Sequence, residues 1–340
     1  MTPRSKKAEE LSFIKKVWIT GSIFAFIIIL ILLLKATFGV LLLILAGTLI
    51  SVFFRGLSDL IKHQTGWREG ACLAISIIGT LVIVFLLFWL LGAKVQSQMA
   101  QLTETLPSTL ENAKNQLNQT YIGQKIVRQV SSPESQRKAE SFVQIFFTNT
   151  FGVLGDIYVV LFIGIFFTVS PNIYKRGIVQ IIPVKGKRKA DQIFIKLGEN
   201  LRKWLKGQLF AMLMVLLLTS TGLLIIGVPM WLALGIIAGL LNFIPNFGPL
   251  IALIPAVLVG LMQSPTMAFW VAGLYISVQV LESNFITPMV QQRLISVPPA
   301  MILIAQLLMA PLTGGWGLVL ATPMLVIVTV LVKELYISRQ

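Results

Sequence analysis

The sequence predicts an all-α, polytopic membrane protein with about eight hydrophobic segments. Its 340 residues are 56% hydrophobic and only 12% charged, and their mean hydropathy is +0.85. Soluble globular chains contain about 45–50% apolar and about 25% charged residues. Several apolar runs reach about 18 residues or more, which is long enough for a membrane-spanning helix. A transmembrane barrel requires segments of about ten residues in which apolar and polar side chains alternate, and the sequence lacks such segments.

The distribution of charge indicates a membrane rather than a nucleic acid as the partner. The net charge is +15 and the isoelectric point is near 10.1. Lysine and arginine concentrate in residues 1–16, 55–70 and 171–206, each beside an apolar run. The positive-inside rule produces this pattern, and it places these segments against the anionic inner leaflet. With one cysteine, Cys72, and one histidine, His63, the sequence predicts no disulfide framework, metal site or cofactor.

Residues 1–92 are predicted to form a cytoplasmic tail and the first three spans. These spans are Val17–Leu34, Ala36–Phe54 and Ala71–Gly92. The first span is too long for a signal h-region and lacks a small-residue cleavage site, so it is expected to be retained. A tight turn at Lys35–Ala36 would join the first two spans into a helical hairpin, and a polar inner loop, Arg55–Gly70, would precede the third.

Residues 93–140 are predicted to be an extracytoplasmic amphipathic helical segment. Their apolar positions recur in steps of about three and four residues, which is a heptad-like stripe. The stripe could rest on the membrane or on its own domain, or it could join copies of the chain into a homo-oligomer. Residues 141–170 follow as the fourth span and carry one carboxylate, Asp156.

Residues 171–206 are predicted to form a basic cytoplasmic segment. It contains ten basic residues against Asp191 and Glu199. Five apolar positions fall on one helix face: Ile193, Leu197, Leu201, Trp204 and Leu205. This pattern predicts a basic amphipathic helix that faces the anionic leaflet.

Residues 207–340 are predicted to be a transport core, which begins with a fifth span, Gly207–Gly227, and contains two broken apolar runs, 229–262 and 301–332. Within the first, Gly239–Pro255 contains three prolines, two asparagines and two glycines. The second is interrupted at Ala310–Gly317 and again at Pro323. Broken backbone is tolerated in a membrane only where protein or a water-filled cavity satisfies it. Paired interruptions therefore point to a transporter binding site, formed by re-entrant hairpins or by kinked spans.

Two carboxylates lie within apolar runs, Asp156 and Glu282. Because an intramembrane charge is costly, such residues suggest a proton or cation relay. The alternatives are a position near the outer surface or a hydrogen-bonded helix contact. Helical spacing places Gln279 on the same face as Glu282, and Asn284 lies close by.

Asn242 and Asn246 flank Pro245 in the first broken run. An asparagine amide offers two donors and an acceptor, which suits a hydroxylated neutral solute. Alternatively, the two side chains cap the broken helix halves.

The sequence lacks the motifs of enzymes that work at or in membranes. It contains no GxxxxGK[ST], HExxH or GxSxG pattern. Gly155–Asp156 is preceded by Gly152, which gives GxxGD rather than the GxGD of intramembrane aspartyl proteases. The protein is therefore predicted not to be an enzyme.

Three segments, Leu240–Leu261, Glu282–Leu294 and Gly314–Val328, resemble the bacterial autoinducer-2 exporter family in order and in motif. The resemblance implies an oligomeric plasma-membrane permease without ATPase subunits, with sodium/proton antiport in some members. The residues that match its motifs, together with Gly314 at the start of GGWG, are Pro245, Gly248, Pro249, Pro255, Glu282, Asn284, Pro288, Gly317 and Pro323. Asn246–Phe247 departs from the family pattern of an aromatic and then a small aliphatic residue.

These observations predict a secondary transporter of the bacterial inner membrane, with both termini in the cytoplasm. It would export a small polar solute, autoinducer-2 or a related molecule, by alternating access without ATP hydrolysis. The alternatives are a sodium/proton antiporter that uses a membrane-embedded carboxylate, and a membrane scaffold or receptor that acts through residues 93–140.

Overall fold

The computed structural model of the chain describes residues 3–86, 89, 155–286, 288 and 298–337. These residues fold into helices, with no strand among them. Five of the described helices are long and apolar enough to cross a membrane, or six if one sharply bent pair counts as a span. The helical membrane class is therefore confirmed, whereas the count of eight segments is not. The predicted segment 93–140 lies outside the described residues.

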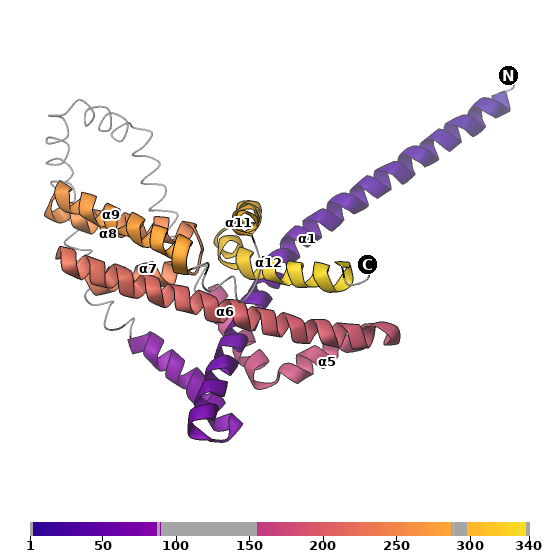
Figure 1. Cartoon of the computed structure of the whole chain (residues 1–340). Coiled ribbons are helices and arrows are strands. Elements are labelled where there is room, and N and C mark those ends of the chain that lie inside the picture. Colours follow the sequence, from indigo (N-terminus) through magenta and orange to yellow (C-terminus); the bar gives the residue numbers. More distant parts are fainter. Residues whose placement is uncertain (1–2, 87–88, 90–154, 287, 289–297, 338–340) are drawn as a thin grey trace, which may run out of the picture.

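Helix α1 (Pro3–Thr65) is one continuous helix of 63 residues. The hairpin predicted at Lys35–Ala36 is wrong, because the helix continues through both residues. Lysine and alanine are good helix formers, and no glycine or proline stands between residues 33 and 38 to end the helix. The N-terminal half of α1 stands clear of the other helices in Figure 1. The helix ends before Gly66, which adopts a left-handed conformation with φ of 68°.

The Gly155–Val169 helix crosses α1 at a contact between two glycines. A Cβ at Gly47 would lie 2.5 Å from Cγ2 of Ile163, and one at Gly164 would lie 2.6 Å from Cγ2 of Ile50. At each glycine, an isoleucine of the other helix therefore packs directly on the backbone. Small residues permit this close approach in membrane helices. At the end of the contact, Arg55 donates from Nε and Nη2 to the Thr168 carbonyl, at 2.9 and 2.7 Å.

The chain bends by 90° between the Gly155–Val169 helix and α5 (Pro171–Ile181). Pro171 causes the bend because its ring restricts the backbone of the preceding residue and its missing N–H suits a first helical turn. Polar and apolar side chains separate onto opposite faces of α5, and none of its eleven residues counts as buried.

Helix α6 (Val184–Ile226) joins the predicted basic segment and the predicted fifth span in one helix of 43 residues. It ends at the predicted position, where Gly227 adopts a left-handed conformation with φ of 82°. The apolar stripe does not lie on a leaflet, which corrects the sequence prediction. Instead Leu201, Trp204 and Leu205 are buried in a core shared with α1 and α12.

Three further helices fold back along the second half of α6. Helix α7 (Trp231–Leu241) is antiparallel to it, with Gly235 against Ser220 and Gly239 against Leu216. Helices α8 (Phe247–Gln263) and α9 (Pro265–Leu281) form a hairpin, and Ser264 Oγ accepts from Met267 N at 3.0 Å to cap α9. A short π-helix, η1 (Glu282–Ile286), continues α9. The shared core includes Leu223, Leu234, Ala252 and Val271.

Helices α11 (Pro299–Thr313) and α12 (Gly315–Leu335) form the second broken run. Its break is at Gly314 alone, because α12 passes through Pro323 without ending. The additional break predicted at Pro323 is therefore wrong; Pro323 is buried among neighbouring helices that support the bend it can introduce. In Figure 1, α12 runs beside the first half of α6.

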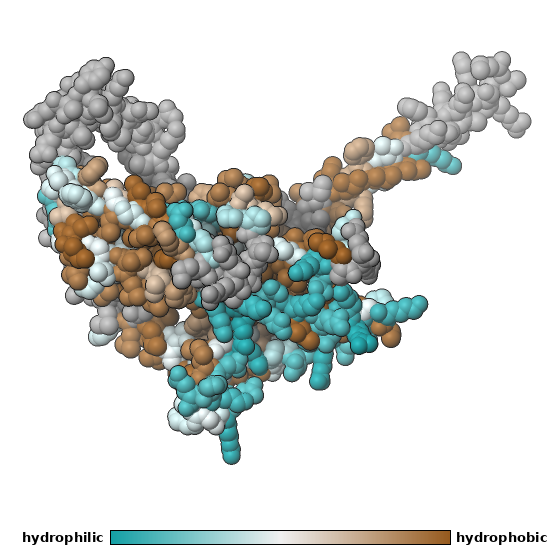
Figure 2. Space-filling view, in the orientation of Figure 1, coloured by the Kyte–Doolittle hydropathy of each residue, from teal (hydrophilic) through white to brown (hydrophobic). Residues whose placement is uncertain are grey.

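An ion-pair cluster fastens the end of α12 to α6. Both carboxylate oxygens of Glu334 are engaged, by Lys189 at 3.0 Å and by Lys196 at 2.5 Å. Figure 2 shows hydrophilic side chains gathered over α5, the first half of α6 and the end of α1. This face is the one that the charge pattern places at a membrane surface.

The glycine contact gives a test of how α1 is held. Replacing Gly47 or Gly164 with leucine should force the two helices apart and cost about 1–3 kcal/mol, which lowers the unfolding temperature in detergent. Gly39→Leu is the matched control, because a Cβ at this α1 glycine would meet nothing within 4 Å. Equal unfolding temperatures for Gly47→Leu and Gly39→Leu would contradict the contact.

Candidate functional site

The first broken run is a helical hairpin whose tip is the turn Asn242–Asn246. Helix α7 has eleven residues and rises about 16 Å, roughly half of the 30 Å or so of a bilayer core. It is antiparallel to α6, and α8 turns back against it in the same hydrophobic core. Of the two predicted arrangements, the structure therefore shows a hairpin and not one kinked span.

Two amides from other helices hold this tip, one of them buried and the other half-buried. Gln306 of α11, which is 0% exposed, donates from Nε2 to the Pro245 carbonyl at 2.8 Å. Its Oε1 accepts from Nδ2 of Asn246 at 3.4 Å. Gln208 of α6 donates from Nε2 to the Asn242 carbonyl at 2.7 Å. The Pro245 carbonyl also accepts from Phe247 N at 2.8 Å. The two amides add donors from other helices to carbonyls that lie where the helix is interrupted.

The Asn242 side chain is buried with an unused donor. The residue is 2% exposed, and its Nδ2 has no hydrogen-bond partner among the described residues. A buried amide donor without a partner costs about 1–3 kcal/mol. We therefore expect an acceptor from outside the described residues, such as water or a solute, at this position.

Asn246 occupies a backbone conformation that few residues adopt. Its φ is 67° and its ψ is −48°, and its side chain makes no capping hydrogen bond to α8. Asparagine tolerates positive φ better than most residues. Such backbone strain persists only where surrounding contacts enforce it, and it clusters at functional sites. Helix capping, one of the two roles predicted for Asn246, is not seen.

Packing fixes the tip against the rest of the protein. The Phe243 ring meets Trp204 of α6 edge-on, with centroids 5.7 Å apart. A Cβ at Gly248 would collide with the Leu241 carbonyl, so the first turn of α8 can approach α7 only with glycine there. Pro249 follows in the first turn, where its missing N–H leaves no helical hydrogen bond unmade.

The Glu282 cluster lies at the end of α9. Gln279 Nε2 donates to Glu282 Oε2 at 3.3 Å and to Ser283 Oγ at 3.1 Å, while Asn284 Nδ2 donates to the Val280 carbonyl at 2.9 Å. Helices α8 and α9 have 17 residues each and are joined by one residue. Glu282 is thereby placed level with the first turn of α8, and η1 packs on α6.

At the second break, the structure uses Asp156 as a helix contact. Trp316 donates from Nε1 to Asp156 Oδ2 at 2.6 Å, which ties the start of α12 to the Gly155–Val169 helix. This is the hydrogen-bonded alternative that the sequence left open for Asp156. Gly314 turns with φ of 63°, and a Cβ at Gly317 would press on Met309.

The structure does not bring all of the predicted site residues together. Asn242, Pro245, Asn246, Gly248 and Pro249 form or border the tip. Other predicted residues lie elsewhere: Pro255 well inside α8, Pro323 inside α12, Gly314 and Gly317 at the second break, and Pro288 just beyond η1. Within the described residues, no group of three or more His, Cys, Asp or Glu side chains could hold a metal ion.

Three residues that contact the site or its supports were not predicted: Gln208, Gln306 and Trp316. Gln306 stands alone in the apolar stretch MILIAQLLMA, and Gln208 stands at the start of the apolar half of α6. A single amide in an apolar run is costly unless it is partnered. That signal was available in the sequence for both glutamines, although it does not identify the partner.

Comparison with known proteins gives a consistent result. Residues 23–337 match the family described as "AI-2E family transporter". The chain is 28% identical over 216 residues to "Putative transport protein YueF" of Bacillus subtilis, covering 62% of this chain and 58% of that protein. It is 27% identical over 152 residues to "Putative transport protein YrrI" of the same organism, covering 45% and 43%. These alignments thus span about half the length of both relatives.

The Trp316–Asp156 contact can be tested through stability. Asp156→Leu should lower the unfolding free energy by about 1.5–3 kcal/mol, because the indole N–H then loses a charged acceptor. Asp156→Asn should retain much of the stability, since its amide oxygen can still accept. Trp316→Phe should resemble Asp156→Leu in thermal or chemical unfolding in detergent. An unfolding temperature for Asp156→Leu at or above that of Asp156→Asn would refute the contact.

Proposed function

Because the chain belongs to the family of AI-2E transporters, we propose that it is a secondary transporter that exports a small, uncharged polar solute. Autoinducer-2 or a related small molecule is the proposed cargo, and transport proceeds without ATP hydrolysis. The observation that supports this proposal most directly is the buried Asn242 amide at the tip of a helical hairpin, whose Nδ2 donor finds no partner within the described part of the chain.

The chemistry at the tip favours a neutral cargo. Four amide side chains belong to the tip or hold it: Gln208, Asn242, Asn246 and Gln306. Amides supply both donors and acceptors, and so they match hydroxyl and carbonyl groups without requiring an opposite charge. A solute with several hydroxyls could accept from Asn242 and exchange hydrogen bonds with Gln306.

The hydrogen bonds that hold the tip are individually weak. Gln208 and Gln306 each donate one short hydrogen bond to a backbone carbonyl, and the net contribution of such a bond is about 1 kcal/mol. The larger cost of a shift of the α7–α8 hairpin against α6 and α11 would come from its packing on α6, at Gly235, Gly239 and Phe243. Such a shift, with the site exposed to each side in turn, is the proposed basis of alternating access.

A second candidate is sodium/proton antiport. Glu282 begins a π-helical turn at the level of the tip, and π-turns inside helices are frequent at functional sites. A carboxylate there could bind a cation and a proton alternately. Asp156 is the weaker candidate for this role, because its carboxylate accepts from Trp316.

The cargo proposal predicts a defect from a change that keeps side-chain shape. Asn242→Leu should lower efflux of autoinducer-2 from proteoliposomes by about fivefold or more, because one solute hydrogen bond is lost. Gln263→Leu is the control: its exposed amide lies at the opposite end of α8, 3.5 Å from the Gly227 carbonyl. If the solute does not use the Asn242 donor, Asn242→Leu should transport normally and be as stable as the native protein or more so.

The antiport candidate makes a separate prediction. Sodium-driven proton movement in the same vesicles should be abolished by Glu282→Gln, whereas Asp156→Asn should leave it in place. Autoinducer-2 efflux that survives Glu282→Gln, together with no sodium-driven proton movement in the native protein, would exclude antiport in favour of solute export.

A further inference from the structure

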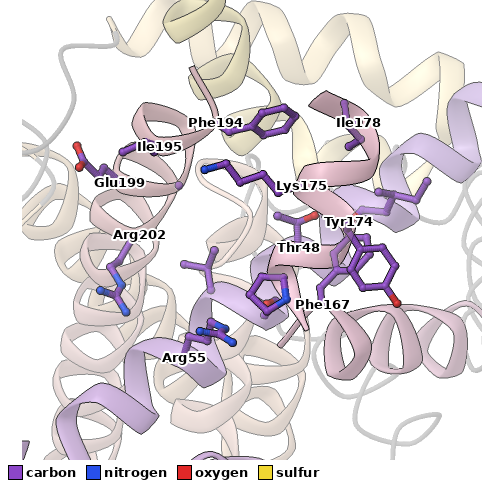
Figure 3. A pocket seen from close by; sticks show the side chains of 15 residues that line it. Thr48, Arg55, Phe167, Tyr174, Lys175, Ile178, Phe194, Ile195, Glu199 and Arg202 are labelled. Atoms are coloured by element: carbon purple, nitrogen blue, oxygen red, sulfur yellow. Dashed lines mark hydrogen bonds between the residues drawn. The ribbon is translucent and has the colours of Figure 1, made fainter. Parts of the chain in front are cut away.

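A pocket of about 610 Å³ lies between α1, α5 and α6, away from the tip. Figure 3 shows its lining, which comes from these helices and from the end of the Gly155–Val169 helix. None of its lining residues belongs to α7, α8, α9, α11 or α12. We propose that this pocket, called here the interfacial pocket, binds an anionic phospholipid, with its phosphate at the cationic end and its acyl chains along the apolar end.

The pocket lies where a lipid headgroup would be. The chain turns by 90° from the Gly155–Val169 helix into α5, so α5 lies across the direction of the helices that span the membrane. An amphipathic helix in that orientation rests in the membrane surface. Ile173, Ile178 and Ile181 of α5 are exposed, as expected for side chains that contact lipid.

The lining changes from apolar to cationic along α1. Ile44, Thr48, Val52 and Arg55 follow one face of this helix and all line the pocket. Eleven residues of helix rise about 16 Å, roughly half of the 30 Å or so of a bilayer core, so this face of α1 can contact both a headgroup and part of an acyl chain. A free polar solute would leave the apolar end uncovered, whereas a phospholipid fills both ends.

The charges favour an anionic headgroup. Arg55, Lys175 and Arg202 line the pocket, and in Figure 3 the Lys175 side chain reaches from α5 towards α6. The fourth charged lining residue, Glu199, points its carboxylate away from the pocket in this view. The lining therefore favours a phosphate over a second cation.

Each of these cations already has an acidic partner. Lys175 is 2.8 Å from Asp191, Arg55 is 3.8 Å from Glu69, and Arg202 pairs with Asp59, but all three acids are at least half exposed. Exposed ion pairs are weak because water screens them, so a phosphate in the pocket can share these cations with their acidic partners. Residues 171–206 also contain ten basic and two acidic side chains, which keeps the local field positive.

Gly198 allows the pocket to be filled selectively. It lines the pocket, and a Cβ there would meet nothing within 4 Å, so Gly198→Leu should occupy the pocket without a clash. Gly177→Leu is the matched control, because Gly177 also has open space but does not line the pocket. Lys175→Gln and its exposed control Lys185→Gln form a second pair that changes charge and not volume.

The test measures the unfolding temperature of the delipidated full-length protein with and without added lipid. Phosphatidylglycerol should raise it by about 5 °C in the native protein and in both controls, and much less in Gly198→Leu and Lys175→Gln. Phosphatidylcholine with the same acyl chains and sn-glycerol 3-phosphate should each have little effect. Equal stabilisation of Gly198→Leu and Gly177→Leu, or equal effects of the two lipids, would overturn the proposal. Stabilisation by sn-glycerol 3-phosphate alone would replace the lipid with a free phosphate ligand. The result does not depend on the identity of the exported solute.

Discussion

The hydrogen bond from Gln306 to the Pro245 carbonyl is the interaction on which the arrangement of both broken runs depends. A proline-containing turn inside apolar surroundings leaves carbonyls without helical donors, and no water is available in lipid to satisfy them. Gln306 of α11 donates to one of these carbonyls, and Gln208 of α6 donates to another. The turn between α7 and α8 therefore favours an arrangement in which α6 and α11 lie beside it.

The same requirement explains why polar residues gather where they do. Asp156 accepts from Trp316, Arg55 donates to the C-terminal end of the Gly155–Val169 helix, and Glu334 forms ion pairs with two lysines. Each contact joins segments more than 100 residues apart in the chain. Long-range polar pairs thus orient helices whose apolar surfaces alone would pack in many ways.

Local features of the sequence predicted the helical class, the position of the first break and the end of α6 at Gly227. Proline, glycine and apolar periodicity act over a few residues, so they can be recognised directly. The partners of the break could not be predicted, because Gln306 lies 61 residues from Pro245 and no local spacing relates them. The turn expected at Lys35–Ala36 is wrong for a related reason: one lysine interrupts the apolar run but does not end the helix, because no glycine or proline is present there.

Helix α6 belongs to every functional element described. It supplies Gln208 to the hairpin tip, Arg202 and Gly198 to the interfacial pocket, and the two lysines that hold Glu334. Arg202 and Gln208 are six residues apart on an uninterrupted helix, so about 9 Å along the helix axis separates them. A lipid in the proposed interfacial pocket that displaces this helix would also change the free energy of solute binding at the proposed site, and thermodynamic reciprocity would make the two effects equal. The composition of the surrounding bilayer and the occupancy of the proposed transport site would then be coupled through one helix.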